Sequence, residues 1–392
     1  MPPHWRVVAL LACAGALNYA DRTSLSVVFP LLRAELSLSD MELAAIGSFF
    51  LWSYAAASPL AGWVVDRYPR QRVITLSLLA WSLVTLLTAL VQSSGALLAT
   101  RVLLGLSECF YLPAAIALIA GHHGPETRGR ALALHAFGLN LGLVGGGALA
   151  GYLGQQYGWR SSLVVLGVLG IGLSLLCHFL LCEAGGRPVT QQPSWTRLLR
   201  NRAWVLLAVE AGLVSLGTWM FFNWMPLYFQ ERFSLSLAFA GFSGTAVLQL
   251  SAVFGLLIGG VMTDAIARRA GLRGRLLAMA LLYVLCVPPL VVFLARAGFP
   301  AVASGVVAFS FLKALAMANE PPALCEIVEE QDRGSAQSLM NMLNTLAGGI
   351  GVYVAGALKA DWGLSGVFAS TGVLILLSAL LTLGVRRASV RP

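Results

Sequence analysis

Charged residues are scarce in this chain: they make up 11% of its 392 residues, while hydrophobic residues make up 58%. A soluble domain carries about 25% charged residues. The composition therefore excludes an ordinary soluble enzyme, a coiled coil and a disordered chain. The net charge is +9, but the basic residues are dispersed rather than gathered into the continuous basic surface that nucleic-acid binding needs. We therefore expect no nucleic-acid partner.

The chain also lacks the patterns of a catalytic or metal site. None of its six cysteines belongs to a Cys-x-x-Cys pair, and no histidine has the spacing of a metal ligand. No phosphate-binding P-loop accompanies the glycines. We therefore expect no metal, no cofactor and no enzymatic activity.

What the chain does contain is a series of long apolar runs separated by short charged stretches. A helix that crosses a bilayer needs roughly 20 apolar residues. The run from Val7 is too long for the core of a cleavable signal peptide, so we expect it to be the first membrane helix. The sequence predicts an all-α membrane protein with twelve transmembrane helices, at about 7–31, 41–64, 73–92, 95–121, 130–153, 161–182, 202–230, 237–261, 276–295, 299–324, 335–358 and 364–384.

The chain divides into two similar halves. The longest polar stretch, 183–201, is rich in Gly, Pro and Gln and is typical of a linker. We predict six-helix bundles at 1–182 and 202–392, joined by this cytoplasmic linker. The run from Gly62 to Asp66 recurs as Gly260 to Asp264 after the eighth span. Such parallel repeats are one plan of membrane transporters, in which the substrate binds near mid-membrane between pseudo-symmetric halves.

The basic residues predict the orientation. With the N-terminus inside, the cytoplasmic segments hold 18 of the 26 lysines and arginines, the outer loops hold five, and three lie within spans. Cytoplasmic loops are enriched in Lys and Arg, so we expect both termini in the cytoplasm. The 24 arginines against two lysines indicate a GC-rich bacterial coding sequence. We therefore place the protein, as a multi-pass monomer, in a bacterial inner membrane.

The loop after the second span carries a recognisable motif: Gly62, then Asp66-Arg67, then a basic cluster with Arg70 and Arg72. It resembles the signature loop of the major facilitator superfamily, whose carriers work by alternating access. The resemblance implies that the loop, with Arg128 before the fifth span, braces the two halves on the cytoplasmic side. A topology signal alone is the alternative for Arg70 and Arg72.

Further runs resemble one branch of that superfamily, the anion:cation symporters that carry hexuronate, galactonate or sialic acid. These runs are Asn18-Tyr19-Ala20-Asp21-Arg22, the set Gly105, Glu108 and Pro113, then Arg128-Gly129-Arg130-Ala131, Gly158-Trp159-Arg160 and Trp224-Met225-Pro226-Leu227-Tyr228. The first also resembles the Spinster lipid carriers. The resemblance implies transport of a small organic anion, such as a sugar acid or another carboxylate, together with protons. The alternative is an exporter of a drug, a metabolite or a lipid-like molecule by proton antiport.

Two carboxylates lie at mid-membrane depth. Asp21 is about 14 residues into the first span and Glu108 about 13 into the fourth. Intramembrane ionisable residues are costly and usually functional. Burial favours the protonated form of a carboxylate, and a neighbouring arginine favours the ionised form. The resemblance implies that Asp21 and Glu108 carry the coupling proton; a permanent ion pair with an arginine is the alternative.

Two cations lie at a similar depth. The guanidinium of Arg22 can bind a carboxylate through two hydrogen bonds, and the resemblance implies that it holds the anionic group of the substrate. Its alternative is an internal partner for Glu108. Lys313 is expected either to contact the anion or to form a fixed ion pair with Asp21 or with Glu320, seven residues on. The charges of these four residues, Asp21, Glu108, Arg22 and Lys313, sum to zero. Adding one proton would give a charge of +1, which would favour binding of a monoanion.

Polar side chains inside apolar spans complete the predicted site. Tyr54 matches a substrate-contacting tyrosine of the resembled family. Asn140, Asn223 and Asn344 are amides that need hydrogen-bond partners in an apolar environment. Either substrate hydroxyls or neighbouring helices can supply these partners.

Overall fold

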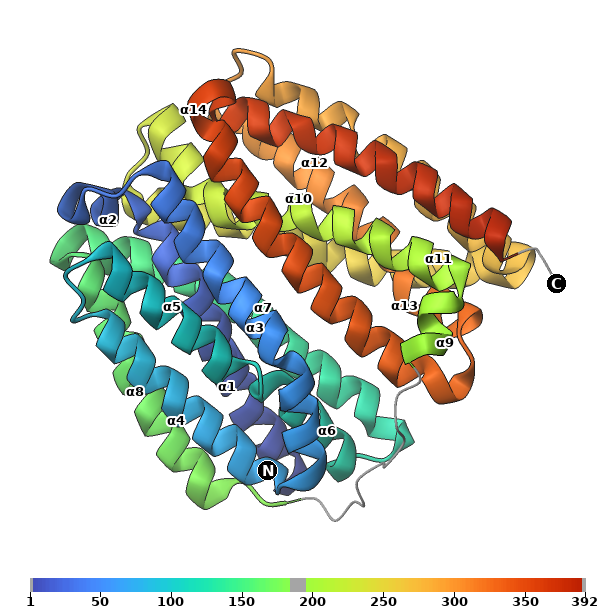
Figure 1. Cartoon of the computed structure of the whole chain (residues 1–392), viewed down its shortest axis with the longest axis horizontal. Coiled ribbons are helices and arrows are strands. Elements are labelled where there is room, and N and C mark those ends of the chain that lie inside the picture. Colours follow the sequence, from blue (N-terminus) through green and yellow to red (C-terminus); the bar gives the residue numbers. More distant parts are fainter. Residues whose placement is uncertain (1–2, 184–194, 390–392) are drawn as a thin grey trace. The chain divides into compact units, whose positions relative to one another are not determined.

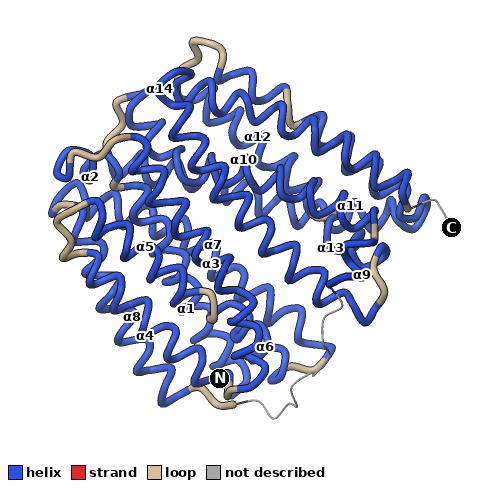
Figure 2. The backbone as a smooth tube through the Cα atoms, in the orientation of Figure 1, coloured by secondary structure: helices blue, strands red, loops and turns tan. Residues whose placement is uncertain are grey.

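The computed structural model describes residues 3–183 and 195–389, and within these ranges it contains helices and no strand (Figure 1, Figure 2). Residues 184–194 of the expected linker and 390–392 of the expected second bundle lie outside the described part. By contacts the chain forms two compact units: unit 1 comprises residues 1–191 and 234–245, and unit 2 comprises 192–233 and 246–392.

Unit 1 contains eight helices and the start of a ninth. They are α1 (Pro3–Val27), α2 (Phe29–Leu36), α3 (Asp40–Arg67), α4 (Arg70–Thr88), α5 (Ser94–Glu108), α6 (Tyr111–His122), α7 (Pro125–Tyr157), α8 (Trp159–Leu180) and the first turns of α11 (Leu237–Leu285). Helix α1 packs along α7, α3 along α5, and α4 along α8. The start of α11 packs on α7, because Gly147 and Gly151 leave room for its backbone.

Unit 2 contains the remaining elements. They are α9 (Trp195–Arg200), α10 (Arg202–Phe233), the rest of α11, η1 (Pro288–Phe293), α12 (Phe299–Met317), α13 (Glu320–Ile327), η2 (Glu330–Asp332) and α14 (Arg333–Ala388). Helices α10 and α14 pack along each other. The long helices α11 and α14 each change direction at one glycine with positive φ, Gly271 at 57° and Gly363 at 61°. Glycine adopts this backbone conformation without the steric cost that other residues incur.

The described residues support twelve crossings. Ten of their helices are long and apolar enough to cross a membrane by length and composition. One of these, Glu330–Ala388, has 59 residues and turns at Gly363, so it provides two crossings. Helix α1 is outside the ten, yet its 25 residues reach about 37 Å, which exceeds a hydrocarbon core of about 30 Å.

The fourth and tenth spans are interrupted helices, where the sequence predicted continuous ones at 95–121 and 299–324. The first break lies at Cys109 and Phe110, between α5 and α6, and the second at Ala318 and Asn319, between α12 and α13. A proline has no N–H to donate to the carbonyl four residues earlier, and its ring collides with that carbonyl. Pro113 and Pro322 stand four residues after Cys109 and Ala318, which explains both breaks.

Small residues set the closeness of α1 and α7. Three glycines of α7, spaced four apart, face three alanines of α1: Gly138, Gly142 and Gly146 against Ala12, Ala16 and Ala20. A Cβ at any of these glycines would overlap atoms of the facing alanine. Such small-residue stripes let membrane helices approach closely. Here the stripe holds in place the helix that carries Asp21 and Arg22.

Candidate functional site

Arg22 and Glu108 form a buried ion pair in unit 1. The Nε of Arg22 donates to Oε2 of Glu108 at 2.9 Å, and the two side chains are 7% and 0% exposed. The guanidinium carbon lies 4.7 Å from the ring centroids of Tyr19 and Tyr54 and 5.1 Å from that of Phe50. Cation–π attraction stabilises a charge in such a position. The predicted substrate contacts Arg22 and Tyr54 are therefore neighbours.

Three elements supply this pair and its aromatic surroundings. Helix α1 carries Arg22, α3 carries Tyr54, and Glu108 is the last residue of α5, immediately before the break in the fourth span. Gly105 lets α5 lie against α3, since a Cβ there would overlap the side chain of Ser53. The break and this close contact together place the Glu108 carboxylate beside Arg22.

A second acid and a second cation, Asp21 and Arg101, lie next to the Arg22–Glu108 pair. The hydroxyl of Thr85, on α4, donates to Oδ2 of Asp21. Arg101, on α5, is 3% exposed and interacts electrostatically with both Asp21 and Glu108. Unit 1 therefore contains a four-charge cluster of Asp21, Arg22, Arg101 and Glu108.

Several polar atoms of the four-charge cluster have no hydrogen-bond partner among the described residues. They are Oδ1 of Asp21, Oε1 of Glu108, and Nε and Nη2 of Arg101. A buried donor or acceptor without a partner costs about 1–3 kcal/mol. The free oxygens are places where a proton can bind, and the free N–H groups of Arg101 are places where an anion can bind. With all four groups ionised, the cluster is neutral.

Lys313 lies in unit 2, where it is 6% exposed. Its Nζ donates to Oγ1 of Thr218 at 3.0 Å. Among the described residues it forms no ion pair with Glu320, which interacts with it only at longer range. The seven-residue spacing places two residues on one face only in a continuous helix, and the break at Asn319 separates this pair.

The three predicted asparagines differ in their surroundings. The Nδ2 of Asn140 donates to the carbonyl of Ala136 in its own helix, at 2.8 Å. The side-chain oxygens of Asn223 and Asn344 are buried and have no hydrogen-bond partner among the residues described. These two amides, on α10 and α14, can still accept a hydrogen bond from a substrate hydroxyl.

The signature loop joins α3 to α4. Gly62, Asp66 and Arg67 lie in the last two turns of α3, and α4 begins at Arg70. The guanidinium of Arg67 lies 4.3 Å from the centroid of the Trp63 ring. Three side chains are exposed, with no ion pair among the described residues: Asp66, Arg72 and Arg128. Arg128 donates through Nε to the carbonyl of His123 at 3.3 Å.

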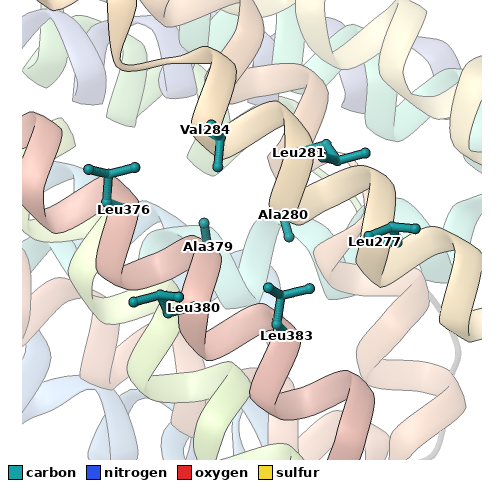
Figure 3. A pocket seen from close by; sticks show the side chains of 8 residues that line it. All are labelled: Leu277, Ala280, Leu281, Val284, Leu376, Ala379, Leu380 and Leu383. Carbon is teal, nitrogen blue, oxygen red and sulfur yellow. The ribbon is translucent and has the colours of Figure 1, made fainter.

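An apolar groove in unit 2 is unsuited to an anion. It has a volume of about 320 Å³ and lies between the second half of α11 and the second half of α14 (Figure 3). Eight aliphatic residues line it: Leu277, Ala280, Leu281, Val284, Leu376, Ala379, Leu380 and Leu383. No polar side chain in this lining can hold a carboxylate.

The sequence pattern did not single out three buried polar residues: Thr85, Arg101 and Glu210. Arg101 is one of the three cations within the predicted spans, and it lies seven residues before Glu108 in the same helix. Glu210 is a lone acid within the seventh span, and Thr85 is one of several hydroxyls in the third. Arg101 and Glu210 are ionisable residues deep within apolar spans, and such a position in the sequence indicates a functional role. Nothing in the sequence distinguishes Thr85 from the other hydroxyl residues of its span.

Comparison with known families supports the membrane-carrier interpretation. Residues 11–294 and 213–392 match the family model described as Major Facilitator Superfamily. A probable galactarate/D-glucarate transporter of Bacillus subtilis is 27% identical over 68% of this chain and 66% of its own length, slightly less than two thirds. A hexuronate transporter of the same organism is 24% identical over 95% of this chain and 92% of its own length.

Two other similarities complete the comparison. An MFS-type efflux pump of Mycolicibacterium smegmatis is 26% identical over 91% of this chain and 84% of its own length. The crystal structure of a bacterial homolog of the human lysosomal transporter Spinster, inward-facing and unoccupied, aligns with a TM-score of 0.84. It is 19% identical and covers 99% of this chain and 98% of its own, so it shows the fold alone.

Proposed function

The chain belongs to the Major Facilitator Superfamily, and we propose that it carries a small organic anion, a sugar acid or another carboxylate, across the membrane together with protons. The coarser statement, that it is a multi-pass membrane transporter, follows from the family and the apolar helices. The four-charge cluster of unit 1 is the observation that carries the proposal.

The four-charge cluster can couple an anion to a proton. Its two carboxylates and two guanidinium groups cancel, and burying a net charge in a low-dielectric interior is costly. Protonating one carboxylate leaves a charge of +1, which one monoanion offsets. Binding of proton and anion together is then favoured over binding of either alone. Within unit 1, Arg101 supplies the second positive charge, and Lys313, in unit 2, stays a proposed anion contact.

The relatives support the class of substrate. Hexuronates, named for one of them, are monoanions with many hydroxyl groups and match one added proton. Galactarate and D-glucarate, named for the other, carry two carboxylates and would need a proton on both Asp21 and Glu108. Arg22 and Arg101 would hold the carboxylate, because a guanidinium matches it through paired hydrogen bonds. Tyr54, Asn223 and Asn344 would contact hydroxyl groups, with Lys313 as a further anion contact. Asn140 remains a weaker proposal, since its amide already bonds within its own helix.

We also propose the location and orientation that the charges favour. The excess of arginine on one side places both termini in the cytoplasm of a bacterium, with the chain in the inner membrane as a monomer. A cysteine-labelling scan tests this orientation. A cysteine introduced at exposed Arg67, in a cysteine-free background, should react with a membrane-impermeant reagent only after the cells are opened.

We propose that the signature loop acts in the transport cycle rather than in substrate binding. Asp66 is exposed at the end of α3 and forms no ion pair among the described residues, so it is free to bind a cation in another state of the carrier. Asp66→Asn should lower the rate of D-glucarate flux at least tenfold. The Kd of the variant for D-glucarate should differ less than twofold from that of the wild type. Normal flux in this variant would show that the loop acts only as a topology signal.

Flux measurements test the proposed function. Purified protein in liposomes should accumulate labelled D-glucarate or D-glucuronate when the outside is made acidic, and a protonophore should abolish accumulation. Absence of gradient-driven uptake of either acid, with folded protein, would refute sugar-acid symport.

Proton-coupled export is the second candidate, because the efflux pump matches 91% of the chain. Antiport would reverse the outcome: an acidic lumen would drive a drug or lipid-like molecule inward, and an acidic exterior would not. The same liposomes with the gradient reversed distinguish the two functions.

A further inference from the structure

A second pair of buried acids lies in unit 2, apart from the predicted proton carriers. Glu210, on α10, is 0% exposed, and neither of its carboxylate oxygens has a hydrogen-bond partner among the described residues. Glu320, the first residue of α13, is 6% exposed. Tyr283, on α11, is fully buried and donates its hydroxyl to Oε1 of Glu320 at 3.3 Å. It also interacts electrostatically with Glu210.

Three further helices bring charged or polar groups to this pair. Lys313, on α12, interacts electrostatically with Glu320, and Cys286, on α11, lies near Lys313. Helix α14, which packs along α10, contributes Ser378, whose hydroxyl donates to the backbone carbonyl of Glu210 at 3.5 Å. Within the described residues, no cation forms an ion pair with Glu210.

The charges of this group do not balance when both acids are ionised. Glu210 and Glu320 would contribute two negative charges and Lys313 one positive charge. An uncompensated charge in a buried site is unfavourable, and two close carboxylates disfavour joint ionisation. One added proton makes the group neutral. Because Lys313 stabilises an ionised Glu320, the proton belongs on Glu210.

We propose that Glu210, Tyr283 and Glu320 form a second proton-binding site, in which Glu210 holds the proton. The position of this site gives it a role in coupling. An organic anion bound at Lys313 would offset the charge that keeps Glu320 ionised, so that Glu320 would take up a further proton. This consequence rests on the proposed function, whereas the proton-binding site itself does not.

Infrared spectroscopy of the full-length protein tests the site without a substrate. An Asp21→Asn, Glu108→Gln background removes the carboxyl groups of the four-charge cluster. At neutral pH this background should still show the carbonyl band of a protonated carboxylic acid. Adding Glu210→Gln should remove the band, because Glu320 and Lys313 then balance. Adding Lys313→Gln together with Glu320→Gln removes a balanced pair of charges and should leave the band. Glu330→Gln, at an exposed position of unit 2, is the matched control and should change nothing.

The outcomes separate this proposal from the proposed function. A background without the band, or a band that survives Glu210→Gln, would overturn the second site. If Glu210→Gln does not fold, Tyr283→Phe in the same background decides. Tyr283 interacts with the Glu210 side chain, so a protonated Glu210 would donate to the Tyr283 oxygen. Loss of that oxygen should shift the frequency of the band, and an unshifted band overturns the site. Failure of the wild type to transport a sugar acid would leave the infrared result unaffected.

Discussion

Arg22 is held from two sides, by the Glu108 carboxylate and by the faces of three aromatic rings. Its Nε donates to Glu108, and the side chain also forms a hydrogen bond with Tyr54. A guanidinium has five N–H groups, so further donors remain for an anion. The side chain can therefore bind Glu108 and a substrate carboxylate at once. A lysine, with a single ammonium group, does not reproduce that geometry.

Arg22→Lys is expected to weaken the binding of D-glucarate at least tenfold, about 1.4 kcal/mol. Isothermal titration on purified protein measures the effect. Arg33→Lys, in the partly exposed ion pair with Asp40, is the matched control and should bind like the wild type. Unchanged affinity in a folded Arg22→Lys variant would remove Arg22 from the substrate site.

The sequence predicted the membrane depth of the charged residues but not which charged residues interact with one another. Counting residues from the span ends placed Asp21, Arg22 and Glu108 at one level, and the structure brings them into one cluster. The partner of each charge depends on helix rotation and on the break after Glu108. Neither can be read from the number of residues, so the sequence alone does not show that Arg101 interacts with Asp21 and Glu108.

The contact between α1 and α7 determines where the first two charges of the cluster lie. Gly142→Ala is expected to destabilise the protein, because the added Cβ would overlap the carbonyl oxygen of Ala16. Overpacking of this kind costs about 1–3 kcal/mol. Thermal unfolding in detergent measures the loss as a lower Tm.

Gly145→Ala is the matched control for that substitution. Gly145 lies on the same helix, and a Cβ there would meet nothing within 4 Å. Alanine is also a better helix former than glycine by roughly 0.5–1 kcal/mol. The control should therefore unfold at or above the wild-type temperature. Equal Tm values for both alanine variants would contradict the close packing of α1 on α7.

Glu35 joins α2 to the start of α8 and gives this contact a pH dependence. It pairs with Arg160 and accepts a hydrogen bond from Nε1 of Trp159 at 2.8 Å. The hydrogen bond from Arg160, and next that from Trp159, hold the pKa of Glu35 below its usual value of 4.5. The stabilisation is therefore fully present above the usual carboxyl pKa and is lost as the pH falls through the lowered value.

Glu35→Gln is expected to lower Tm at neutral pH by a small amount, since exposed pairs contribute about 0.2–1 kcal/mol. The difference from wild type should disappear in acid, where the wild-type carboxyl is also neutral. Thermal unfolding at a series of pH values measures this. A difference that stays constant down to the acid limit would show that Glu35 stabilises the fold by packing alone.

At the scale of elements, the sequence predicted the apolar spans to within a few residues but missed their interruptions. Hydropathy averages over a whole span and is insensitive to a break of two residues. Pro113 and Pro322 were the available signals, because each removes one helix hydrogen bond. The two breaks adjoin Glu108 and Glu320, one acid of each buried group.

The molecule as a whole repeats a plan in its two units. In the described residues, unit 1 has an interrupted span at α5–α6 and unit 2 has one at α12–α13. An acid beside each break interacts with a cation: Glu108 with Arg22, and Glu320 with Lys313. In unit 1 the charges cancel in the ionised state; in unit 2 they cancel only after one proton is added. The sequence predicted the all-helical membrane fold and the family, because apolar length and loop motifs are local properties. Charge balance is a property of the packed units and needed the structure.

The central claim is that Glu108, in the four-charge cluster, carries the coupling proton, and Glu108→Gln tests it most directly. The amide mimics the protonated carboxyl permanently, so the variant should still exchange labelled for unlabelled D-glucuronate, a monoanion, across a liposome membrane. It should no longer accumulate D-glucuronate when the exterior is made acidic, whereas the wild type should. Accumulation by Glu108→Gln under that gradient would contradict the account, because the proton would then be carried without this carboxylate.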